Sequence, residues 1–264
     1  SSVYGVLQLV TDVSGDNLRG KVEASVKKAG KGFELEFTEV QEQQQILYTA
    51  YKFGGGDVDV GFFNAPNSSG TKSITEPGFQ PNFLRLFATP SLNSMDSTNN
   101  ELSNGTDVGW GQGVAVENSS GVKQGSLAVS QFTSNIDGHA YTSSDTDVFS
   151  IAFMNGKTTL DGTAKGSVSF TNNGFDINFG TVNAPNNETP LTVYLAADSV
   201  SEPDAGFEKT PTGTGSVSYS TDTDLDNLCV FSSNTIPAFN QERGVASQTW
   251  GWNYGQLNNA TDTQ

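Results

Sequence analysis

Blocks of sequence recur 142 positions apart along a chain of 264 residues. GKVEASV (20–26) aligns with GTAKGSV (162–168), and GFELEF (32–37) aligns with GFDINF (174–179). Two further blocks match after small shifts, pairing residues 46–53 with 191–198 and residues 83–92 with 227–236. Two copies are too few for a solenoid, in which many short repeats stack to build one core. Each repeat is therefore expected to be a self-sufficient domain.

A tryptophan set among glycines marks the same place in both repeats. GWGQG (109–113) returns as GWNYG (251–255). Two further strand-like runs follow the first motif, whereas only QLNNATDTQ follows the second. We predict domains at residues 1–142 and 143–264, and we expect the second to lack its last strands or to come from a longer or processed chain. An unfinished sheet of this kind has unpaired N–H and C=O groups to which a neighbouring subunit can add a strand.

Within each repeat the apolar residues follow a period of two. Phe33, Leu35 and Phe37 alternate with glutamates, and residues 175–179 repeat this pattern. Successive side chains of a strand point to opposite faces, so each segment is predicted to be a half-buried strand. Similar runs are separated by clusters of Gly, Asn, Pro and Ser, and no segment shows a convincing helical period. The sequence predicts an all-β fold of two tandem antiparallel β-sandwich domains with jelly-roll-like connections.

The acidity of the chain comes mainly from a shortage of basic residues. Lys and Arg total 13 against 29 Asp and Glu, which gives a formal net charge of −16. A phosphate backbone needs clustered basic residues to displace its counterions, so nucleic-acid binding is not expected. No apolar run reaches the roughly 18 residues of a membrane-spanning helix, so no membrane partner is expected. The single cysteine, Cys229, cannot form an intramolecular disulfide, and ordinary core packing must stabilise the domains.

Side chains suited to catalysis are sparse. The only histidine, His139, lies in a turn-rich link. One His with one Cys supplies too few suitable side chains for a Cys/His zinc site, and the lone His has little prospect of forming a Ser-His-Asp triad. A glycosidase needs only two carboxylates about 5 to 10 Å apart. The candidates are Asp57 with Asp59, Asp145 with Asp147, and the group Asp222, Asp224 and Asp226. None of them recurs in the other repeat, and all are expected in turns or on solvated strand faces. We therefore expect no enzyme activity and no cofactor, and we keep polysaccharide cleavage as a less favoured alternative.

Three aspartates near the start of a predicted strand resemble a calcium-binding loop. Asp222, Asp224 and Asp226 alternate as the first oxygen ligands of such a loop do. Asn227 stands where the loop needs glycine, and Ser233 stands where its bidentate glutamate belongs. A solvated turn is the favoured interpretation, and these aspartates stay weak candidates for a looser cation site.

Aromatic residues of the repeated tryptophan motif allow two interpretations. Trp110 and Trp252 each follow a glycine at the same place in the repeat, which favours a position in the core of each sandwich. Aromatic faces also stack on sugars. Trp250 and Tyr254 share the parity of Trp252 and would lie on the same side of one strand. Trp250, Trp252 and Tyr254 are therefore the candidates for contact with a glycan or a partner.

Several blocks together resemble β-sandwich repeats of virion structural proteins from tailed phages and related viruses. The blocks are PGFQPNFLRLF (77–87), GWGQG (109–113), GTAKGSVSF (162–170), GFDINFGTVNAP (174–185) and TVYLAAD (192–198). The chain departs from that pattern where DTDLDNLCVF (222–231) replaces the GFQP turn and where QEQQQ (41–45) replaces the NAP turn. The resemblance implies a virion-surface component, either capsid decoration or tail-associated, that docks other virion proteins and forms a homo-oligomer. A carbohydrate-binding or adhesin module that contacts host-surface glycan is the alternative.

Overall fold

The computed structural model is all-β over the residues that it describes. It describes the backbone of residues 7–10, 13–14, 17–18, 21–29, 32–40, 56–89, 107–132, 138–155, 159–184, 189–201, 203–206, 227–233, 242–246 and 252–258, and of 214, 216, 218 and 220. Side chains are described at 36, 56–89, 109–130, 140–154, 160, 162–184, 189–201, 203–206, 214, 216, 218 and 220. Within these ranges every regular element is a strand and every strand pair is antiparallel, so the predicted all-β class is confirmed there.

The chain divides into two compact units, and the first consists of residues 1–52 and 94–103. Its main element is an antiparallel sheet of three described strands in the order β1-β4-β5. The strands of this unit are β1 (Leu7–Val10), β2 (Val13–Ser14), β3 (Asn17–Leu18), β4 (Lys21–Ala29) and β5 (Gly32–Val40). β2 and β3 form a short separate pair.

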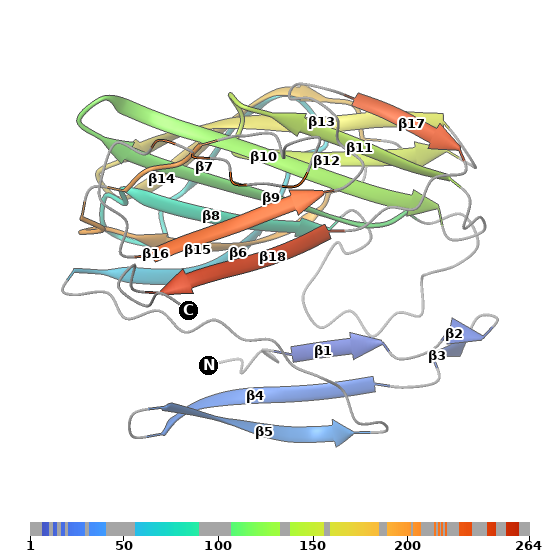
Figure 1. Cartoon of the computed structure of the whole chain (residues 1–264), viewed down its shortest axis with the longest axis horizontal. Coiled ribbons are helices and arrows are strands. Elements are labelled where there is room, and N and C mark those ends of the chain that lie inside the picture. Colours follow the sequence, from blue (N-terminus) through green and yellow to red (C-terminus); the bar gives the residue numbers. More distant parts are fainter. Residues whose placement is uncertain are drawn as a thin grey trace. The chain divides into compact units, whose positions relative to one another are not determined.

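The second unit consists of residues 53–93 and 104–264 and contains two larger sheets (Figure 1). The large sheet has the described order β17-β11-β10-β9-β8-β15-β6, and the small sheet has the order β12-β13-β14-β7. The large-sheet strands are β6 (Val58–Asn64), β8 (Phe83–Thr89), β9 (Asp107–Asn118), β10 (Gly121–Phe132), β11 (Gly138–Ser144), β15 (Leu191–Ala197) and β17 (Glu242–Ala246). The small-sheet strands are β7 (Gly70–Ile74), β12 (Phe149–Asn155), β13 (Thr159–Thr171) and β14 (Gly174–Val182), and β16 (Asn227–Ser233) pairs with β18 (Trp252–Asn258).

One hydrophobic core is shared by the large and small sheets. Leu86 and Tyr194 enter it from the large sheet, and Phe149, Phe175 and Phe179 enter it from the small sheet. Phe149 packs edge-on against Phe179, with ring centroids 5.2 Å apart, and Phe175 packs edge-on against Tyr194 at 5.3 Å. Such edge-to-face pairs add to the stabilisation that burial gives. The second unit is therefore sandwich-like, with two layers held by one core.

Glycines bring the two layers close together at β9. A Cβ at Gly111 would collide with the carbonyl oxygen of Ser150, and a Cβ at Gly113 would collide with that of Val148. These glycines face the small sheet, so Trp110, the residue before Gly111, points to the other face of the large sheet, where it is half-buried. The expectation that Trp110 fills the shared core is wrong, because the close backbone approach leaves room only for glycine on that face.

The three-stranded sheet of the first unit has the same register as part of the small sheet. Leu7 lies opposite Ala24, and Phe149, 142 positions further along, lies opposite Gly166. The hairpins β4-β5 and β13-β14 agree over the corresponding positions, including a register shift after Glu23 and after Lys165. The hydrogen-bonded pairs β8-β9 and β16-β18 also share their register, since Phe83 opposite Val116 corresponds to Asn227 opposite Asn258.

The compact units group strands from both sides of residue 142. β11 runs through this residue, and the large sheet joins β9 and β10 to β15. The repeat boundary between residues 142 and 143 was placed from sequence similarity, and the division into domains at that point stays a prediction.

Candidate docking surface

Five exposed apolar side chains gather at one edge of the large sheet. β6 contributes Val58, Val60 and Phe62, which are 42%, 64% and 41% exposed. β15 contributes Val193 and β8 contributes Phe87, which are 37% and 43% exposed. We call these five residues the edge patch. Soluble monomers rarely leave a contiguous apolar patch in water, so the edge patch is the candidate docking surface.

The strand register brings the edge patch together across three neighbouring strands. Phe62 lies opposite Val193, which in turn lies opposite Phe87. Val60 belongs to the next row, which runs through Leu195 on β15 to Arg85 on β8. The guanidinium carbon of Arg85 stands 4.7 Å from the ring centroid of Phe87. This cation–π contact places one positive charge beside an otherwise apolar surface.

At the edge patch, side chains on the outer face of the large sheet are exposed to solvent. Among the described strands, β6 ends the sheet and has a strand partner on one side only. Nearer the middle of the same face, over β9, β10 and β11, side chains are buried, namely Gln112, Val116, Val129 and Tyr141. A partner at the edge patch would therefore contact apolar side chains on the last described strand of the sheet.

The apolar residues of β6 face outward because Tyr194 determines the inner face. A Cβ at Gly61 would collide with the Tyr194 ring, so the ring packs where Gly61 has no side chain. The Tyr194 hydroxyl donates a 2.6 Å hydrogen bond to Oδ2 of Asp59. Burial, followed by the hydrogen bond and negative charge of Asp59, raises the pKa of Tyr194 above its usual range. Asp59, Gly61 and Phe63 thus face the core, and the alternate residues face solvent.

Neither residue of the candidate carboxylate pair Asp57–Asp59 is placed like a catalytic acid. Asp59 is half-buried against Tyr194, so the expectation of a solvated position is wrong for this residue. Asp57 lies at an exposed corner, where its N–H donates a 2.6 Å hydrogen bond to Asp198 Oδ1. The N–H of Asp198 donates in return to the Asp57 carbonyl at 3.1 Å. These contacts hold β6 beside the end of β15.

The second carboxylate pair lies in the turn between β11 and β12. The Ser144 hydroxyl donates a 2.7 Å hydrogen bond to Oδ2 of Asp147 and accepts one from the N–H of Thr146 at 3.2 Å. Asp145 is exposed. The contacts of Asp147 therefore stabilise the turn that joins the two sheets.

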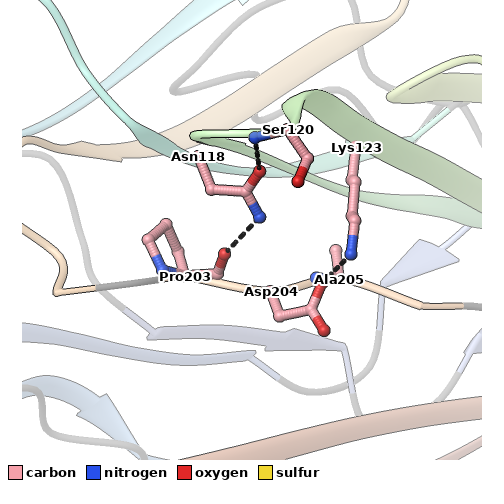
Figure 2. A network of polar contacts seen from close by, with 6 residues as sticks. All are labelled: Asn118, Ser120, Lys123, Pro203, Asp204 and Ala205. Atoms are coloured by element: carbon pink, nitrogen blue, oxygen red, sulfur yellow. Dashed lines mark hydrogen bonds and ion pairs between the residues drawn. The ribbon is translucent and has the colours of Figure 1, made fainter. Parts of the chain in front are cut away.

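Residues 198–206, described except for 202, are held against the end of the large sheet next to the edge patch. The Asn82 amide donates to the Val200 carbonyl at 2.9 Å, and its oxygen accepts from the Val200 N–H at 3.2 Å. Asn118 donates to the Pro203 carbonyl at 3.2 Å, and Lys123 Nζ lies 2.7 Å from Asp204 Oδ1 (Figure 2). The side chains of Lys123 and Asp204 are 33% and 10% exposed, so this ion pair is partly shielded from water.

Most other predicted site residues lie where their side chains are not described. Asp222, Asp224, Asp226 and Trp250 lie outside the described residues altogether. For His139, Cys229, Trp252 and Tyr254 only the backbone is described, in β11, β16 and β18. β18 places Trp252 and Tyr254 two positions apart, opposite Ser233 and Phe231. The two aromatics therefore occupy alternate positions of one strand, as their spacing predicted.

The edge patch was not among the site residues predicted from the sequence. The run VDVGFF (58–63) predicts a strand by its alternation, and β6 confirms that strand. The alternation shows that Val58 and Val60 share a face, but it does not show which face meets the core. The missing information is the position of Tyr194, more than 130 residues further along the chain.

Comparison with known proteins gives no match to a family model, a curated protein or a solved structure. Within the described ranges, no group of three or more His, Cys, Asp or Glu side chains is arranged to hold a metal ion. The same part of the chain contains no helix long and apolar enough to cross a membrane.

Proposed function

We propose that the protein is a structural component of a virion surface, as capsid decoration or as a tail-associated protein, and that it acts by docking subunits rather than by catalysis. The observation that carries the docking role is the edge patch, where five apolar side chains lie exposed on β6, the last described strand of the large sheet, and on its neighbours β15 and β8. A second copy of the chain is the partner, since a two-fold contact between identical strands is self-complementary. The position on a virion rests on the resemblance of the sequence blocks to phage structural proteins.

We further propose that the chain consists of two tandem repeats of a jelly-roll-like sandwich. Two observations support this proposal. The strand pairs β1-β4 and β12-β13 share their register at an offset of 142 positions. The pairs β8-β9 and β16-β18 share theirs as well. Tandem sandwiches suit a surface protein, because packed sheets form durable modules that present their edges and loops to neighbours.

A charge placed in the edge patch tests the docking role. Val60→Asp puts a carboxylate on the most exposed of the five residues and should leave folding intact. In the interface it would be buried without a partner, so we expect the dissociation constant for self-association to rise at least about tenfold. Val122→Asp is the matched control, because Val122 is 37% exposed but lies outside the edge patch. Size-exclusion chromatography with light scattering measures both variants. A wild-type chain that stays monomeric at high concentration would overturn the docking role.

Immunogold labelling tests the virion location separately. Antibody against the chain should label the outside of intact particles at regular positions on the capsid or the tail. Label found only on lysed particles or on host membranes would contradict a surface position. The result is independent of the Val60 variant, so the location and the docking surface can fail separately.

A glycan-binding module is the second candidate function. It is favoured by one observation, the position of Trp252 and Tyr254 on alternate residues of β18. Neighbouring aromatic rings on one strand can stack on a sugar. Binding on a glycan array that Trp252→Ala abolishes would support this function, and Trp110→Ala is the control from the other repeat. An array without any bound glycan would exclude it for the sugars tested.

A further inference from the structure

The two sheets that share one core combine strands from successive repeats, and we call them the central sandwich. β8 and β9 of the large sheet lie before residue 142, whereas β12, β13 and β14 of the small sheet lie after it. Buried residues of both groups form the core, namely Leu84, Leu86, Phe149, Phe175, Ile177 and Phe179. The backbones also approach closely, since a Cβ at Gly111 of β9 would collide with the carbonyl oxygen of Ser150 of β12. A β8-β9 pair and a β12-β13-β14 sheet are therefore complementary parts of one sandwich.

Both parts occur a second time in the chain. The sheet β1-β4-β5 has the register of β12-β13-β14 at an offset of 142 positions, and we call it the N-terminal part. The pair β16-β18 has the register of β8-β9, and we call it the C-terminal part. The N-terminal part belongs to the first compact unit and the C-terminal part to the second. The described strands thus include one more set of both parts, divided between the two units.

Apolar residues occupy the core positions of both parts. In the N-terminal part, the places of Phe149, Phe175, Ile177 and Phe179 are taken by Leu7, Phe33, Leu35 and Phe37. In the C-terminal part, the places of Leu84 and Leu86 are taken by Leu228 and Val230. Both parts therefore have the residue types that the core of the central sandwich requires.

Glycine is retained at one of the two places where the backbones of the central sandwich meet. Gly255 of β18 corresponds to Gly113, whose Cβ would collide with the carbonyl oxygen of Val148. Asn253 corresponds to Gly111, so the backbones need a wider spacing at that row. The C-terminal part therefore fits a β12-type strand with its closest approach at Gly255.

We propose that the N-terminal part of one copy packs on the C-terminal part of a second copy and builds another sandwich of the central type. Gln8 of β1 then lies near Asn253 of the second copy, as Ser150 lies near Gly111. The two surfaces differ, so the contact is head to tail, and contacts of this kind close into a ring or continue as a filament. This head-to-tail contact rests on the proposed tandem repeat and gives the docking function a second surface, distinct from the edge patch.

The order of the parts along the chain favours a second copy. In the central sandwich the β8-β9 pair comes before the β12-β13-β14 sheet. Within one chain the C-terminal part instead comes after the N-terminal part, and the two belong to different compact units. Where one copy is followed head to tail by the next, the C-terminal part again precedes the N-terminal part that it meets. A second copy thus restores the order in which the central sandwich is built.

Cross-linking between two full chains tests the contact and its source. One chain carries Gln8→Cys and the other carries Asn253→Cys, each with Cys229→Ser, and the chains bear tags of different size. A short bismaleimide should join them as a heterodimer. Asn258→Cys is the mismatched control, because it lies five residues further along β18, about 17 Å away. Its yield with Gln8→Cys should be lower by about tenfold or more, since the reaction needs both thiols held close together.

Thr71→Cys with Asn178→Cys in one chain is the positive control for the reagent, because these exposed residues lie opposite each other. A heterodimer of the matched pair, with folding verified by circular dichroism, supports the head-to-tail contact. Equal yields from the Asn253 and Asn258 variants would overturn the register. If Gln8→Cys and Asn253→Cys in one chain are joined only within that chain while the mixed chains do not react, the second copy is overturned as the source. Absence of either product, while the positive control reacts, would overturn the pairing of the two parts.

Val60→Asp separates this contact from the edge patch. The substitution should leave the yield of the matched cross-link unchanged, because Val60 belongs to β6 of the central sandwich. Absence of the cross-link, while Val60→Asp still weakens self-association, would overturn the head-to-tail contact alone. A matched cross-link that forms while Val60→Asp has no effect on self-association would support this contact and overturn the edge patch.

Discussion

The ring of Tyr194 packs across Gly61, and its hydroxyl donates a 2.6 Å hydrogen bond to Asp59. This contact determines which face of β6 meets the core. It leaves Val58, Val60 and Phe62 on the outer face, where they form most of the edge patch. The outward orientation of these β6 residues is therefore a consequence of one aromatic side chain on the neighbouring strand.

Tyr194→Phe should remove both this hydrogen bond and a pH dependence of stability. At neutral pH we expect a loss of about 2 kcal/mol in the free energy of unfolding, because the acceptor is a carboxylate. The pKa of Tyr194 is raised in the folded state. The unfolded chain thus loses this proton first, and wild-type stability, complete below about pH 10, falls as the pH rises above it. Urea denaturation between pH 7 and 11 measures the difference between the two proteins.

Asp59→Asn is the control for the cause of that pH dependence. Burial is the largest contribution to the raised pKa of Tyr194, ahead of the hydrogen bond and charge of Asp59. Asp59→Asn should therefore reduce the alkaline loss of stability, whereas Tyr194→Phe should remove its contribution completely. Equal alkaline slopes in wild type and Tyr194→Phe would contradict the assignment.

Gly113→Ala should separate the two sheets or prevent folding. The added Cβ would meet the carbonyl oxygen of Val148, which is backbone and cannot rotate away. Overpacking of this kind costs about 3 kcal/mol or more. Gly180→Ala on β14 is the control, since its Cβ would meet nothing within 4 Å, and its effect should stay within about 0.5 kcal/mol. Urea midpoints measure both variants, and equal midpoints would show that the layers tolerate a methyl group at Gly113.

The sequence predicts the strands better than it predicts their faces. The period of two in residues 33–37 and 175–179 indicated strands, and both segments lie within strands, β5 and β14. A period of two leaves two choices of face, and a shift of one residue exchanges them. In β6 the choice depends on Tyr194, and in β9 it depends on the backbone of residues 148–150. Both determinants come from distant parts of the chain, so local pattern could not reveal them.

Because local pattern does not show which face of a strand meets the core, the sequence did not predict the edge patch. The sequence directed attention to carboxylates and tryptophans, whose chemistry is recognisable from residue type. Asp59 instead serves to position Tyr194, and Trp110 lies outside the shared core because Gly111 and Gly113 face it. An exposed apolar patch consists of the same residue types as a hydrophobic core, so residue type alone does not reveal it. It becomes visible only when the strand order places β6 at the end of the sheet.

Thr192→Val should stabilise the protein. Thr192 is fully buried, and its Oγ1 has no hydrogen-bond partner in the described part of the chain. Valine has nearly the same shape and removes the cost of the unsatisfied hydroxyl, so we expect a gain of about 1 kcal/mol. Ser130→Ala is the contrasting variant, because the Ser130 hydroxyl donates a 2.6 Å hydrogen bond to the Ala152 carbonyl. It should lose about 1 kcal/mol in the same denaturation experiment. A loss of stability in Thr192→Val would indicate that its hydroxyl has a partner.

The ion pair of Lys123 and Asp204 should couple the β9–β10 hairpin to the segment that follows β15. The two groups lie 2.7 Å apart, and Asp204 Oδ1 also accepts a 2.8 Å hydrogen bond from the N–H of Ala205. Lys123→Met and Asp204→Asn, measured singly and together, form a double-mutant cycle. Because Lys123 is a third exposed, we expect a coupling of only about 0.5 to 1 kcal/mol, smaller still in 1 M salt. Additive effects at low salt would show that Asp204 acts through Ala205 alone.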